Sequence, residues 1–111
     1  MNLVIATNFL PSRFDAYTVG FVILVRPEKR NNKALIAHEA THVKQFWRTF
    51  GLAGLFYTFS KKKRYEYELE AYRAQLALSQ GSDGVFATYL ATNYGLDVTV
   101  AEARADLLKQ G

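Results

Sequence analysis

The sequence predicts an α+β fold in which a small N-terminal β element packs on a mainly helical core. Three observations lead to this prediction. The first apolar runs are short and rich in β-branched and aromatic residues, which is typical of strands. From residue 34 onward the apolar residues recur with helical spacing, and glycines follow the helical segments. The 111 residues, half of them hydrophobic, fit a single domain over residues 1–111.

The β element is expected to come from two segments. Leu3–Ala6 is a short apolar piece that fits a strand. Tyr17–Val25 is β-branched and aromatic, and Pro27 ends it, so we expect it to form one strand. Together the two segments predict a hairpin or a short sheet.

Four helices are expected after the strands. Three of them are followed by a glycine, which commonly ends a helix, and the last begins with a capping box of Thr99 and Glu102. The region Leu52–Ser60 is apolar and favours neither state. The expected helices are Ala34–Phe50, Tyr65–Gln80, Val85–Tyr94 and Thr99–Gln110.

Composition excludes several classes of protein. The absence of cysteine rules out a disulfide scaffold, a cysteine nucleophile and a thiolate metal site. The longest apolar run, Val19–Val25, is too short for a membrane-spanning helix. The N-terminus lacks the basic and apolar regions of a signal peptide, so we expect a cytoplasmic protein. A net charge of +4 describes solubility and encounter, and it does not define the fold.

One motif carries chemistry. Residues 38–42 read His-Glu-Ala-Thr-His, the H-E-x-x-H pattern, and they contain both histidines of the chain. On a helix, His38 and His42 stand one turn apart on the same face, which suits two nitrogen ligands of one tetrahedral zinc ion. Glu39 is rotated by ~100° from His38, so it is placed to act as a general base on a water. The alternative is an ordinary helix surface with two histidines and a glutamate.

The helix geometry places this pair at the edge of an apolar stripe. We expect Thr41, Gln45 and Thr49 on the polar side of the histidines. The pair would then lie at the boundary between core and solvent, as the floor of a cleft requires. The stripe consists of Leu35, Ile36, Val43, Phe46, Trp47 and Phe50.

A third ligand must carry oxygen, because no cysteine or further histidine is present. The second long helix offers three alternating glutamates. Its apolar stripe favours Glu68, with Glu66 second and Glu70 facing solvent. Glu66 and Glu70 are more simply explained as a solvated charged face.

H-E-x-x-H followed by a helix with E-x-x-A resembles the gluzincin branch of zinc metallopeptidases, over about residues 17–76. The specific matches are residues 38–42 and Glu68 to Ala71. The chain also resembles small phage and bacterial proteins with a bare H-E-x-x-H core. The resemblance implies Glu68 as third ligand, and an edge strand that holds a peptide substrate. Where many gluzincins have an aspartate, this chain has Tyr72, whose hydroxyl could take over part of that supporting role.

The resemblance implies a zinc-dependent peptidase. Zn²⁺ on the three ligands would activate a water, Glu39 would take its proton and pass it to the leaving amine, and a peptide or protein would be the substrate. A further group must stabilise the oxyanion. The candidates for that role are Tyr65, Tyr72, Tyr57 and Arg64.

Two other functions compete. The chain could be a zinc-binding core of limited catalytic ability that acts as an interaction module. It could also contact nucleic acid through the basic run Lys61–Arg64, which we otherwise expect to be a solvated connection. The apolar segment Leu52–Phe59 could form an exposed patch for a partner or a membrane surface, or it could line the substrate pocket.

Overall fold

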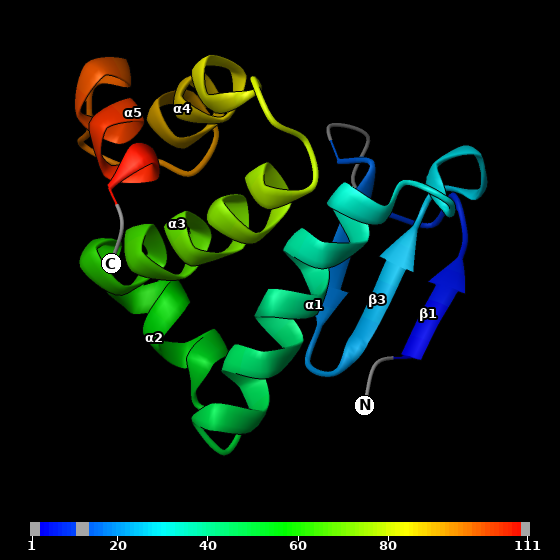
Figure 1. Ribbon diagram of the computed structural model, residues 1–111. Helices are drawn as coiled ribbons and strands as arrows, with labels where there is room; N and C mark the ends of the chain where they lie inside the picture. The colour runs from blue at the N-terminus through cyan, green and yellow to red at the C-terminus, as the bar shows by residue number, and fades with distance from the viewer. Residues whose placement is uncertain (1–2, 11–13, 110–111) are drawn as a thin grey trace.

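The structure is a computed structural model that describes residues 3–10 and 14–109, and it has the predicted α+β architecture (Figure 1). A small sheet lies on one side of the molecule and the helices lie on the other. The strands are β1 (Leu3–Ala6), β2 (Ala16–Val19) and β3 (Val22–Val25). After a 3-10 turn (Pro27–Lys29), the helices are α1 (Lys33–Arg48), α2 (Ala53–Phe59), α3 (Lys61–Ala77), α4 (Asp83–Thr92) and α5 (Val100–Leu108).

The sheet has the order β1-β3-β2, with β1 parallel and β2 antiparallel to β3. The prediction of one strand over Tyr17–Val25 is wrong, because the chain reverses at Gly20. Val19 pairs with Val22 across a two-residue turn, and Gly20 has a φ of +60°. Gly at the first turn position with positive φ is typical of a tight hairpin, and the unbroken apolar run concealed it.

One face of the sheet packs against α1, which lies between the sheet and the other helices (Figure 1). Ile23 and Val25 on the central strand are fully buried, and Val22 and Leu24, which alternate with them, are half-buried. β1 is exposed along its length. The strand next to α1 at the other edge of the sheet is therefore β2, which also contacts that helix.

The helices form where the sequence predicts them, with shifts at their ends. Asn32 caps α1 by accepting a hydrogen bond from the main chain of Leu35, and the Thr99–Glu102 capping box of α5 is present. α3 begins at Lys61, capped by Ser60, so the basic run is helical and is not a loop. The apolar region Leu52–Ser60, for which the sequence favoured neither state, contains the helix α2. The predicted end of the last helix, Gln110, lies outside the described residues.

The main hydrophobic cluster lies where α4 and α5 pack on α3. Within residues 3–10 and 14–109, none of the helices has both the length and the apolar character needed to span a bilayer. The buried members of the cluster are Tyr72, Phe86, Ala87, Leu90, Ala103 and Leu107.

Candidate metal centre

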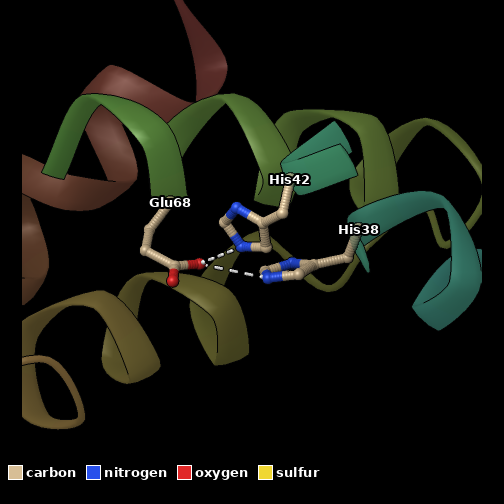
Figure 2. Close-up of side chains that lie close together, drawn as sticks. All are labelled: His38, His42 and Glu68. Carbon is tan, nitrogen blue, oxygen red and sulfur yellow. Dashed lines mark hydrogen bonds and ion pairs between the residues drawn. The ribbon is translucent and has the colours of Figure 1, made fainter. Parts of the chain in front are cut away.

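Three side chains from two helices converge between α1 and α3 (Figure 2). The Nε2 atoms of His38 and His42 each lie 3.1 Å from Oε1 of Glu68. One ligand atom from each residue lies within 4.8 Å of the other two. His38 and Glu68 are each 4% exposed. This buried His-His-Glu group could hold a metal ion.

The local sequence explains this convergence. The two histidines are four residues apart on α1, so both rings point to α3, as Figure 2 shows. On α3, Glu68 points inward between the buried residues Tyr67 and Ala71. Glu66 is exposed, and Glu70 lies half-exposed in an ion pair with Arg48. The structure thus brings the favoured glutamate to the histidines and leaves the two others outside.

The charges of the cluster stabilise one another. Burial lowers the pKa of His42, but the carboxylate of Glu68 outweighs burial and raises that pKa from 6.5 to about 9. Burial likewise raises the pKa of Glu68, and the two histidines bring it far below the usual range of a carboxyl group. Without a metal, His42 and Glu68 are therefore an ion pair at neutral pH. Metal binding at His42 requires the loss of the imidazole proton.

Gln45 orients His42. Its Oε1 lies 2.9 Å from Nδ1 of His42, and its Nε2 donates to the main-chain oxygen of Tyr67 and to Glu70. Because the amide oxygen only accepts, Nδ1 of His42 carries the proton and Nε2 of the neutral ring is left to bind a metal. Glu70 is held in turn by Arg48, 2.9 Å away. This role of Gln45 was not predicted from the sequence, although Gln45 follows His42 by three residues on the same helix.

His38 is held differently. The ring of Tyr72 lies edge-on to it, with 4.3 Å between the ring centroids. The Tyr72 hydroxyl shares a hydrogen bond with Tyr94, so it does not support Nδ1 of His38 as the sequence led us to expect. Among the described residues, that buried Nδ1 atom has no hydrogen-bond partner. Both rings bond to Glu68 through Nε2, but on the Nδ1 side packing positions His38 and a hydrogen bond to Gln45 positions His42.

Glu39 is buried beside the cluster and is held from the sheet. Thr18 on β2 donates a hydrogen bond of 2.7 Å to Oε1 of Glu39. The other carboxylate oxygen of Glu39 lies 4.0 Å from Nε2 of His38. Nothing in the sequence around Thr18 indicates this contact, because it joins residues 21 positions apart.

The structure separates the four candidates for oxyanion stabilisation. The Tyr57 hydroxyl donates to Oε2 of Glu68 at 2.6 Å, and burial raises the pKa of Tyr57, so that the hydroxyl stays protonated. The Tyr65 hydroxyl instead donates to Asp106 on α5. Arg64 donates to three main-chain oxygens, those of Tyr57, Thr58 and Tyr94. Only Tyr57 therefore places its hydroxyl against the ligand cluster.

The burial of residues along and just after α1 differs from the prediction. Thr41 and Gln45, expected on the polar side of the histidines, are buried at 7% and 2% exposure. Trp47 and Phe50, expected in the apolar stripe, are 53% and 95% exposed. The reason is that α3 covers the polar side of α1 and satisfies Gln45 through hydrogen bonds.

A cavity of about 310 Å³ opens beside the cluster. β2, α1, α2 and α3 form its walls, and it is lined by His38, Glu39, His42 and Glu68. From the ambiguous apolar segment, α2 contributes Ala53 and Tyr57 to the wall. Ala16, Tyr17 and Thr18 of β2 lie opposite. The metal-ligand group is thus open to a ligand of moderate size.

One comparison with known proteins bears on this region. Residues 12–49 match the eCIS core domain, a family linked to phage-like contractile injection systems. The match covers about a third of the chain and includes β2, β3 and the H-E-x-x-H helix, but it ends before Glu68. No curated protein and no solved structure is significantly similar to the chain.

Proposed function

We propose that this chain is a zinc-dependent peptidase with Glu39 as its general base. The observation that carries the proposal is the placement of a buried carboxylate beside a His-His-Glu group at the wall of one cavity. Two imidazoles and a carboxylate are a ligand set of catalytic zinc sites, which keep a further position open. The cavity provides the space for that position.

His38, His42 and Glu68 would hold the zinc ion. When bound, zinc supplies Lewis acidity, which lowers the pKa of a water to ~7 and polarises a carbonyl group. Gln45 fixes the ring of His42 for this purpose, and the Tyr57 hydroxyl fixes the carboxylate of Glu68.

Glu39 would take the proton of the attacking water and deliver it to the leaving amine. Thr18 holds one of its oxygens, so the other is directed at the ligand cluster. Glu39 is only 7% exposed, which keeps bulk water from competing for this proton transfer.

The cavity walls suit a peptide. β2 is an edge strand, and its residues line the cavity, so its main chain can pair with an extended substrate. Tyr57 also lines the cavity with its hydroxyl at the cluster, and we assign it the stabilisation of the oxyanion, for which its single proton would have to turn from Glu68 to the reacting carbonyl oxygen. The hydroxyls of Tyr65 and Tyr72 bond to Asp106 and Tyr94, neither of which belongs to the His-His-Glu group.

The test combines metal content with hydrolysis. The purified chain is expected to bind one zinc ion and to cleave members of a mixed fluorogenic peptide library. Glu39→Gln should keep the zinc and lose cleavage by at least ~10³-fold, as removal of a general base allows. Glu68→Ala should lose the zinc, and the matched control Glu66→Ala should keep both, because Glu66 is exposed.

Other outcomes contradict the proposal. A chain that takes up no zinc at neutral pH has no metal centre. Zinc binding with no cleavage in any form would support the alternative, a metal-binding interaction module. Equal cleavage by wild type and Glu39→Gln would remove Glu39 from the mechanism.

A further inference from the structure

One apolar surface faces away from the metal centre. α2 is attached to the molecule by its buried residue Ala53 and its half-buried residue Tyr57, and its remaining apolar side chains are exposed. In Figure 1 α2 lies below α3, on the side opposite α4 and α5. We call this region the α2 surface: Phe50 (95% exposed), Leu52 (50%), Leu55 (53%), Phe56 (38%) and Phe59 (80%).

The backbone conformation at Phe50 indicates that the stability of the fold does not account for a phenylalanine at this position. Phe50 has a φ of 54°, the left-handed region that disfavours residues with a bulky side chain. Glycine or asparagine would end α1 there at lower cost. A phenylalanine that is almost fully exposed gains no hydrophobic burial in return. Neither conformation nor packing accounts for its presence.

The segment that contains the α2 surface is basic in sequence, but Glu70 and Asp97 from elsewhere in the chain pair with its Arg48 and Lys61. Residues 40–65 contain six basic residues and no acidic one. Lys62 and Lys63 lie in the first turn of α3, are exposed, and have no ion pair within residues 3–10 and 14–109. The six basic residues are Lys44, Arg48, Lys61, Lys62, Lys63 and Arg64.

We propose that the α2 surface docks on an anionic lipid bilayer. The Phe and Leu side chains would enter the boundary between headgroups and acyl chains, and Lys62 and Lys63 would lie at the lipid phosphates. Neither apolar contact nor charge alone anchors a protein firmly, and the combination does. Nucleic acid fits less well, because leucine does not stack on bases and Arg64 is bound to three main-chain oxygens.

The first experiment measures binding of the full chain to vesicles. Co-sedimentation with phosphatidylcholine vesicles containing a third phosphatidylglycerol is compared with phosphatidylcholine alone. We expect binding to the anionic vesicles, at least tenfold weaker binding to the neutral ones, and loss of binding at high salt. Trp47, the single tryptophan, lies one turn before Phe50, so its emission should shift to the blue on binding.

Paired variants separate the two contributions. Phe50→Asn with Phe59→Gln should weaken vesicle binding at least tenfold, and asparagine suits the backbone at position 50. Its control is Phe9→Gln, an equally exposed phenylalanine in the connection after β1. Lys62→Gln with Lys63→Gln should also weaken binding about tenfold or more. Its control is Arg30→Gln with Lys33→Gln, which removes the same charge at the far end of α1.

Thermal melts verify that each variant is folded. Equal binding to neutral and anionic vesicles, or equal losses in the variants and their controls, would overturn the proposal. So would an absence of vesicle binding. Retention of single-stranded DNA without vesicle binding would assign the surface to nucleic acid. A self-association that disappears with Phe50→Asn and Phe59→Gln, without lipid binding, would assign it to a second copy of the chain.

Discussion

Two regions of the molecule bury different kinds of side chain. One is the interface between α1 and α3, and the other is the lobe formed by α4 and α5. The first buries polar and charged side chains, and the second buries apolar ones. Tyr72 belongs to both, since its ring lies 4.3 Å from that of His38 and 5.1 Å from that of Phe86. The buried polar set is His38, Glu39, Thr41, Gln45 and Glu68, and the α4 and α5 set is Phe86, Ala87, Leu90, Ala103 and Leu107.

This difference in buried side chains indicates which region stabilises the fold and which region binds a ligand. Burial of apolar area stabilises a fold directly, whereas buried charges carry a desolvation cost that their partners only offset. The lobe is therefore expected to supply stability, and the α1–α3 interface to supply binding. Substitutions in the two regions should change different measured quantities.

The largest effect is expected in the lobe. Leu90 is fully buried, so Leu90→Ala leaves a cavity and should lower the free energy of unfolding by about 2–5 kcal/mol. Urea titration followed by circular dichroism measures it. Zinc affinity should stay within a factor of three, because the apolar cluster to which Leu90 belongs contains none of the three candidate ligands. A large loss of affinity in a variant that remains folded would contradict the division.

A smaller effect is expected when His42 loses its support. Gln45→Met keeps the size of the side chain and removes the acceptor of Nδ1, so zinc should bind 10- to 100-fold more weakly. Competition with a chromophoric chelator measures this. The control is Gln80→Met, at an exposed position beyond α3. An unchanged zinc affinity would show that Gln45 serves only the packing of α1 on α3.

The smallest effect is expected at the sheet. Thr18→Val removes the hydroxyl that holds Glu39 and keeps the shape of the side chain. One lost hydrogen bond is worth ~1 kcal/mol, so the rate of peptide cleavage should fall about three- to tenfold. Zinc affinity should not change, since the Thr18 hydroxyl bonds to Glu39, which is not one of the three candidate ligands. A loss of zinc would show that β2 shapes the metal site itself.

The residues of the site whose positions follow from the spacing within a single helix could be predicted from the sequence. His38 and His42 follow from their spacing, and Glu68 follows from the direction it takes relative to the apolar residues of its helix. Thr18 and Gln45 could not be predicted in their roles. Thr18 depends on how the sheet lies on α1, and Gln45 is buried only because α3 covers it.

The errors in the fold prediction also have physical causes. The hairpin was missed because Gly20 lies inside a continuous apolar run, where its positive φ cannot be recognised from hydrophobicity. The predicted apolar stripe of α1 failed at Trp47 and Phe50, since nothing in the described part of the chain covers them fully. A face of a helix is buried only when another element reaches it.

The segment between His42 and Glu68 contains the whole of α2. An ion held by both residues would act as a cross-link that closes a loop of 26 residues and lowers the entropy of every state in which α2 is loose. Linkage is reciprocal: if ion binding strengthens the binding of a partner to α2, that partner raises the affinity for the ion by the same factor. Binding of a partner to the outer face of α2 can therefore be detected as a change in the affinity of the site for the ion.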